Sequence, residues 1–142
     1  MEQPTEIITI AYAIQQAVAP VFLLTGVGAI LGVLSTRLAR VIDRFRVLDT
    51  LIGNERLLHA IEMETLIRRS RWIHWAISLC TSCALLICVV IAALFIGSES
   101  GKDPSTTIAA LFIAAMLALI AGLLCFLREI TLSTGIINIP KS

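Results

Sequence analysis

The hydrophobic positions of the chain fall into three long blocks that polar segments separate. The blocks Ala17–Thr36, Trp72–Gly97 and Thr106–Leu127 contain no Asp, Glu, Lys or Arg. About 20 apolar residues in a helix cross the roughly 30 Å hydrocarbon core of a bilayer. The pattern therefore predicts three membrane-spanning helices, over residues 17–36, 72–97 and 106–127.

A second pattern begins where the first block ends and continues into the polar segment. Hydrophobic residues there alternate at spacings of four and three, which is typical of a helix that packs along one seam. Leu34 and then the hairpin seam residues Leu38, Val41, Phe45, Leu48 and Ile52 make up this series. The first helix is thus expected to continue past the membrane and the second helix to return, so that residues 37–71 form a cytoplasmic helical hairpin.

Together these patterns predict an all-α fold: an integral membrane helical bundle of three transmembrane helices, the first two extended into the hairpin. Of the 142 residues, 58% are hydrophobic and only 15% are charged. A soluble domain has about 25% charged residues. We therefore expect one membrane domain over residues 1–142, with the lipid bilayer as its first partner. Whether residues 5–16 span the membrane or lie at its interface stays open.

The basic residues are distributed very unevenly along the chain. Of eleven Lys and Arg, eight lie between Arg37 and Arg71, and two more follow the third block. Short loops rich in Lys and Arg stay in the cytoplasm. This distribution predicts a multi-pass protein of the bacterial inner membrane with its N-terminus outside and its C-terminus in the cytoplasm.

All three blocks carry small residues at every fourth position, a pattern that lets membrane helices approach closely. These candidate helix-packing residues are Gly28 and Gly32 in the first block, Ala76, Cys80, Ala84 and Cys88 in the second, and Ala110, Ala114, Ala118 and Gly122 in the third. The two cysteines of this stripe are therefore interpreted as small packing residues and not as metal ligands or a redox pair.

The stretch "RLARVIDRFR" at residues 37–46 raises the question of a binding site. Arg37 and Arg40, with Trp72 and Trp75, are expected either to contact lipid headgroups or to surround the mouth of a pore. Nearby acidic residues offset much of the charge, so nucleic acid is not an expected partner. Ser78, Thr81 and Ser82 are the candidate pore lining, although their hydroxyls can instead bond to the preceding helical turn.

Residues for catalysis are not apparent. The two histidines, His59 and His74, have no nucleophile or metal ligand at a suitable spacing, and a catalytic site needs such a constellation. No phosphate-binding glycine loop is present. We therefore expect a protein without enzymatic activity, cofactor or metal.

Three stretches resemble a bacterial membrane family described as domain of unknown function 2721. They are "AIQQAVAPVFLLTGVGAILGVLSTRLARVIDR", "RRSRWIHWAI" and "AGLLCFLREI", and the resemblance runs from about residue 10 to residue 132. It implies a small multi-span helical protein of prokaryotic inner membranes. It supplies no catalytic or substrate-binding residue to transfer.

Two functions remain open at this point. The hairpin seam must be buried, and the returning arm with Leu58, Ile61 and Thr65 matches its spacing poorly. We therefore expect a homo-oligomer, which as a helical assembly could enclose a passive pore. The alternative is an accessory or scaffolding subunit that packs onto a larger membrane protein complex.

Overall fold

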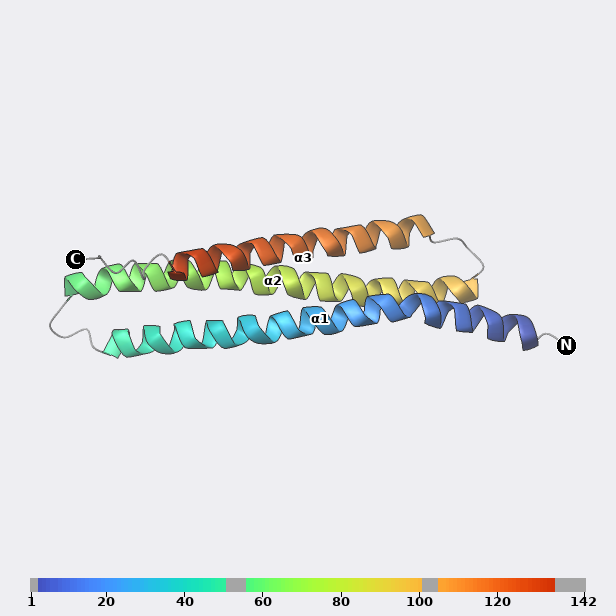
Figure 1. Cartoon of the computed structure of the whole chain (residues 1–142), viewed down its shortest axis with the longest axis horizontal. Helices are drawn as coiled ribbons and strands as arrows, with labels where there is room; N and C mark the ends of the chain where they lie inside the picture. Colours follow the sequence, from blue (N-terminus) through green and yellow to red (C-terminus); the bar gives the residue numbers. More distant parts are fainter. Residues whose placement is uncertain (1–2, 51–55, 101–104, 135–142) are drawn as a thin grey trace. The chain divides into compact units, whose positions relative to one another are not determined.

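The computed structural model contains three long α-helices and, over the residues it describes, no strand (Figure 1). It describes residues 3–50, 56–100 and 105–134. Helix α1 runs over Gln3–Thr50, α2 over Arg56–Ser100 and α3 over Ser105–Thr134. All three are long and apolar enough to cross a membrane, which indicates a multi-pass membrane protein. Long helices suit this environment because each one satisfies its backbone hydrogen bonds internally.

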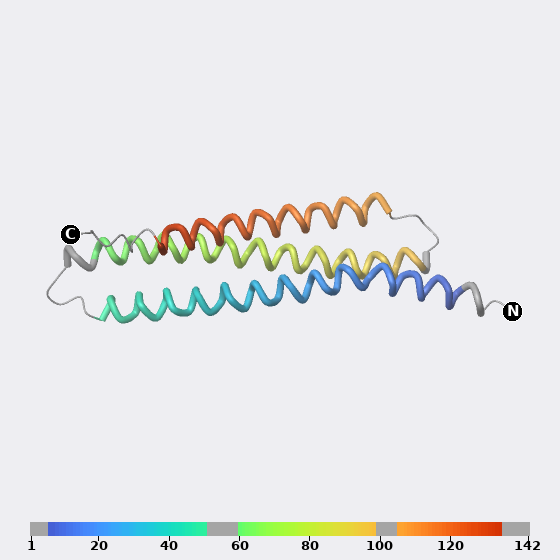
Figure 2. Tube along the Cα trace, viewed as in Figure 1, coloured from blue at the N-terminus to red at the C-terminus, as the bar shows by residue number. Residues whose placement is uncertain are grey.

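Helices α1 and α2 are longer than a span requires. They contain 48 and 45 residues, whereas α3 contains 30. At 1.5 Å per residue, α1 extends about 72 Å, more than twice the thickness of the hydrocarbon core. Helix α1 continues without a break through Pro20 and bends within its N-terminal part (Figure 2). Proline removes one helical hydrogen bond and is a common cause of such bends.

Buried residues recur every seven positions on each helix, a spacing typical of helices that pack at small crossing angles. The series on α1 is Ala13, Pro20, Val27, Leu34, Val41 and Leu48. The two series on α2 are Leu66, Ile73, Cys80 and Ile87, and Ala76, Cys83 and Val90. The series on α3 is Ala115, Gly122 and Glu129.

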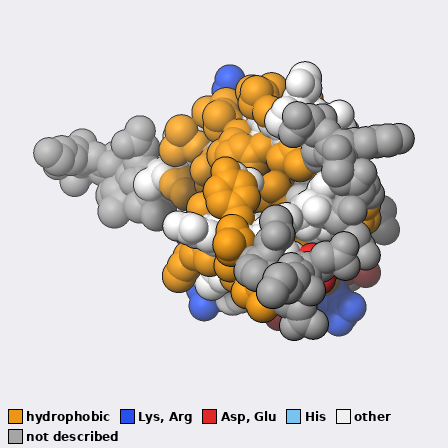
Figure 3. Space-filling model, turned by 90° about the vertical axis from the view of Figure 1, so that its right-hand side faces the viewer, with side chains coloured by type: hydrophobic (Ala, Val, Ile, Leu, Met, Phe, Trp, Pro, Cys, Tyr) orange, Lys and Arg blue, Asp and Glu red, His pale blue; other side chains and the backbone are white. Residues whose placement is uncertain are grey.

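The chain divides into two compact units, and every helix contributes a segment to both. Unit 1 consists of Met1–Ile30 with Cys80–Leu119, and unit 2 consists of Leu31–Leu79 with Ile120–Ser142. Hydrophobic side chains cover much of the described surface on the face shown in Figure 3. The expectation of one membrane domain over the whole chain remains a prediction.

The hairpin seam is buried within unit 2. Val41 and Leu48 form a core cluster with Leu66 and Ile73 of α2, and Leu38, Met63 and Ile77 pack against it. Phe45 is half-buried, and Ile52 lies outside the described residues. Helix α2 thus covers the seam with Met63, Leu66, Ile73 and Ile77. The seam does not need a second copy of the chain to bury it.

Candidate functional site

The most unusual residue of unit 2 is Glu129, whose side chain is 0% exposed. It lies seven residues after the buried Gly122 of α3, and so on the same face of the helix. Among the described residues it is the only charged side chain in the buried class. A carboxylate removed from water requires partners that replace its lost hydration.

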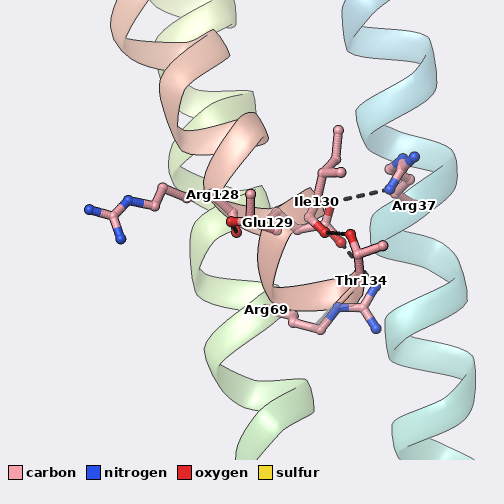
Figure 4. A network of polar contacts seen from close by, with 7 residues as sticks. Arg37, Arg69, Arg128, Glu129, Ile130 and Thr134 are labelled. Carbon is pink, nitrogen blue, oxygen red and sulfur yellow. Dashed lines mark hydrogen bonds and ion pairs between the residues drawn. The ribbon is translucent and has the colours of Figure 1, made fainter. Parts of the chain in front are cut away.

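Two arginines from two other helix segments provide those partners (Figure 4). Arg37 of α1 donates from Nη1 to Oε2 of Glu129 at 3.2 Å. Arg69 of α2 donates from Nη2 to Oε1 at 2.9 Å. Each carboxylate oxygen therefore has its own guanidinium group. The contact joins all three helix segments of unit 2, and we call these three residues the clamp.

The two arginines of the clamp differ in their surroundings. The Arg37 side chain is 40% exposed and its guanidinium lies over the ring of Phe126, 5.2 Å from the centroid. The Arg69 side chain is only 22% exposed. Its Nε atom is buried and has no hydrogen-bond partner within the described part of the chain. Arg69 therefore depends more on Glu129 than Arg37 does, because water can still solvate Arg37.

The geometry of the clamp favours a structural role over a catalytic one. Each oxygen of Glu129 accepts a hydrogen bond from an arginine of another helix and the side chain is 0% exposed, which is typical of a contact that holds helices together. Thr134 does not assist, since its hydroxyl donates to the Ile130 carbonyl at 2.6 Å. Within the described ranges, no group of three His, Cys, Asp or Glu residues could hold a metal ion.

Unit 2 contains two basic pockets, one lined in part by clamp residues and the other by their neighbours in sequence. One, of about 330 Å³, is lined by Arg37, Arg40, Val41, Arg44, Leu66, Arg69 and Ser133. Three of its four arginines already contact a carboxylate, in Glu129 or Glu62. The other, of about 460 Å³, is lined by Arg68, Arg71, Trp72, Arg128, Thr131 and Leu132. Its lining has no acidic residue.

Unit 1 contains a different kind of pocket, of about 640 Å³, between segments of all three helices. Its lining is mainly apolar and includes Ala13, Leu94 and Phe112. Its polar residues include a pair on α1, in which Gln16 Nε2 donates to the Tyr12 hydroxyl oxygen at 2.7 Å. The others are Thr9, Ser98 and Ser105. This pocket has room for an apolar group but no charged residue to orient one.

The structure buries some of the small residues proposed for helix packing and exposes others. Ala76, Cys80 and Gly122 are buried, and Ala84 and Ala118 are half-buried. The exposed ones are Gly28, Gly32, Cys88, Ala110 and Ala114. At Gly28 and Gly32, a Cβ atom would meet nothing within 4 Å among the described residues. Among the described residues, the first stripe therefore has no close neighbour on another helix.

The residues expected to contact headgroups or to line a pore differ in their exposure. Trp72 is half-buried, whereas Trp75 and Arg40 are exposed. Arg37 is part of the clamp, so it is more than an exposed anchor. Ser78 is half-buried, and Thr81 and Ser82 are exposed on α2.

Sequence reasoning missed two members of the clamp, Glu129 and Arg69. A signal for Glu129 was present, because it follows the proposed packing residue Gly122 by seven positions. Nothing distinguishes Arg69 from its neighbours Arg68 and Arg71 in the sequence. Only the register of α2 decides which of the three faces α3.

The chain belongs to the family described as protein of unknown function (DUF2721), whose model matches residues 17–139. This match confirms the resemblance drawn from the sequence, and it includes all three residues of the clamp. No curated protein and no solved structure matches the chain.

Proposed function

We propose that this protein is a non-enzymatic, multi-pass protein of the bacterial inner membrane that assembles into a homo-oligomer. The observation that carries the proposal is the open glycine face of α1, formed by Gly28 and Gly32. This face lies in an apolar span, yet no other helix segment of the described chain covers it.

An uncovered pair of glycines four residues apart is suited to contact with another membrane helix. Without side chains, two helix backbones can approach closely and gain van der Waals contact, which drives association where no hydrophobic effect operates. The hydroxyl groups of the neighbouring threonines do not prevent such an approach of two helices. Thr25 donates to the Val21 carbonyl at 3.2 Å and Thr36 donates to the Gly32 carbonyl at 3.0 Å, so both are satisfied within α1.

The proposed orientation places the charged part of the chain in the cytoplasm. Ten of the eleven Lys and Arg belong to unit 2, which supports a cytoplasmic location for the hairpin and for the end of α3. In this orientation the clamp lies at the cytoplasmic edge of the membrane, where it fixes α3 to the first two helices.

The experiment is native mass spectrometry of the protein extracted with its own lipids. Wild type should give one closed stoichiometry. The Gly28→Leu/Gly32→Leu variant should appear mainly as monomer, because the added side chains separate the helices. Gly26→Leu is the matched control: it adds a side chain at similar depth, also without a neighbour within 4 Å in the described chain. It points about 160° away from Gly28 around the helix.

Three results would separate the alternatives. An unchanged stoichiometry in the double variant would exclude the glycine face as the contact. Co-extraction of wild type with a larger, unrelated membrane protein would favour an accessory or scaffolding subunit. If the homo-oligomer forms, its conductance in planar bilayers tests for a passive pore, and Ser82→Leu should reduce any current that passes along the exposed face of α2.

A further inference from the structure

The basic pocket between α2 and α3 has no assigned role in the assembly proposed above. Arg68, Arg71 and Trp72 line it from α2, and Arg128, Thr131 and Leu132 line it from α3. Its volume is about 460 Å³. All six residues belong to unit 2, so the pocket lies within one compact part of the chain.

The arginines of this pocket are not neutralised, unlike those of the clamp. The side chains of Arg71 and Arg128 form no hydrogen bond or ion pair with any residue in the described ranges. Arg68 has one distant contact, 3.9 Å from Nη2 to Glu64 Oε1, and both side chains are largely exposed. Arg128 points away from the clamp, as Figure 4 shows. Three arginines therefore line this pocket, and its lining has no acidic residue.

The position of the pocket along the helices indicates the depth at which it lies. The second apolar block begins at Trp72, and the third ends at Leu127, directly before Arg128. Both helices therefore pass from apolar to charged sequence at this pocket. Tryptophan and arginine at such a transition are typical of the headgroup region of a bilayer.

We propose that this pocket binds a phosphate group, as carried by the headgroup of an anionic phospholipid. Guanidinium groups bind phosphate oxygens through paired, charge-assisted hydrogen bonds, and basic pockets between membrane helices on the cytoplasmic side accept lipid headgroups. Arginine supplies the recognition. The Thr131 hydroxyl donates to the Arg128 carbonyl at 2.8 Å and is not free to donate to a ligand.

The test titrates detergent-purified protein with phosphatidylglycerol and counts bound lipid by native mass spectrometry. The variant Arg71→Gln/Arg128→Gln should bind about 30-fold more weakly, because each arginine near an anionic surface contributes a factor of about five. The matched control is Arg44→Gln/Arg46→Gln, which removes the same charge from two exposed positions of α1. It should change the affinity less than about threefold, since screening weakens distant exposed charges. Unchanged tryptophan fluorescence in both variants verifies folding.

Further arms identify the source of the phosphate. Phosphatidylcholine, which carries a phosphate but no net charge, should bind weakly and equally to all variants. Inorganic phosphate that binds wild type, fails to bind Arg71→Gln/Arg128→Gln and displaces the lipid would assign the pocket to a soluble phosphate. Equal weakening in the two double variants, or none in either, would overturn the proposal, because the arginines of this pocket would then have no specific part in binding.

Discussion

Unit 1 and unit 2 are built from segments of the same three helices, yet their buried side chains differ. Those of unit 1 are mostly small: Ala13, Ala17, Val27, Cys80, Cys83, Ile87, Val90 and Ala115. Those of unit 2 are larger and include a charge: Leu34, Val41, Leu48, Leu66, Ile73, Ala76 and Glu129. Small residues suit packing in lipid, where close backbone approach is the main attraction. Large apolar residues suit packing next to water, where their burial is itself favourable.

The two units also differ in their polar contacts. Every ion pair found among the described residues lies in unit 2. In unit 1, Gln16 contacts Tyr12 and Thr25 contacts Val21, and each of these contacts lies within one helix. One seven-residue packing pattern thus carries two kinds of buried side chain, and the proposed orientation explains the difference by placing the hairpin of unit 2 next to water.

The largest expected effect comes from removing the buried charge of the clamp. Glu129→Ala should lower the free energy of unfolding of unit 2 by about 3–5 kcal/mol, because it leaves Arg69 with its buried atoms unpaired. Titration with a denaturing detergent measures this change, with the fluorescence of Trp72 and Trp75 as the signal for the unfolding of unit 2. Reaction of Cys80 and Cys83 with a thiol reagent reports on unit 1, in a background where Cys88 and Cys125 are serine.

Controls for this prediction come from neighbouring residues of the clamp. Arg128→Ala, one residue away and exposed, should change the free energy by less than about 0.5 kcal/mol. Arg69→Ala should cost more than Arg37→Ala, since the Arg37 side chain is 40% exposed and the Arg69 side chain 22%. A similar loss for Glu129→Ala and Arg128→Ala would mean that the clamp does not stabilise unit 2.

A second prediction compares the apolar cores of the two units. Leu48→Ala in unit 2 should lower the free energy of unfolding by about 2–5 kcal/mol, because in the proposed orientation this core is surrounded by water and loses both burial and packing. Ile87→Ala in unit 1 should cost only about 1–2 kcal/mol, because lipid is as apolar as the lost side chain and only contacts disappear. Both residues are at most 1% exposed, so the comparison is matched for burial. Equal losses would argue against different environments for the two units.

The helices were predictable from the sequence because they depend on local, repeated properties. Long apolar blocks predict membrane helices, and the alternation from Leu34 to Leu48 predicts that α1 continues beyond its block. The structure contains all three helices, and α1 continues beyond its apolar block to Thr50. The burial of Val41 and Leu48 also follows from that alternation. What covers them did not follow, because the partner segment depends on the register between α1 and α2.

The helix-packing residues show where a local pattern stops being informative. Residues four apart differ by 40° around a helix, so a stripe of four drifts by about 120° and leaves its starting face. In α2 the stripe is buried at Ala76 and Cys80 but exposed at Cys88, and in α3 it is exposed at Ala110 but buried at Gly122. The clamp was harder still to predict, since Arg37 and Glu129 are 92 residues apart in sequence.

The smallest expected effect comes from the other cross-helix ion pair of unit 2, between Arg44 and Glu62. Its geometry is as good as that of the clamp, with Arg44 Nε and Nη2 at 3.0 and 2.9 Å from Glu62 Oε1. Its side chains, however, are 55% and 43% exposed. Arg44→Ala should therefore lower the free energy of unfolding by no more than about 1 kcal/mol in the tryptophan assay, because water solvates whichever charge remains. A loss as large as that of Glu129→Ala would show that distance and not burial determines the strength of these pairs, and the contrast between the clamp and the exposed pair would no longer hold.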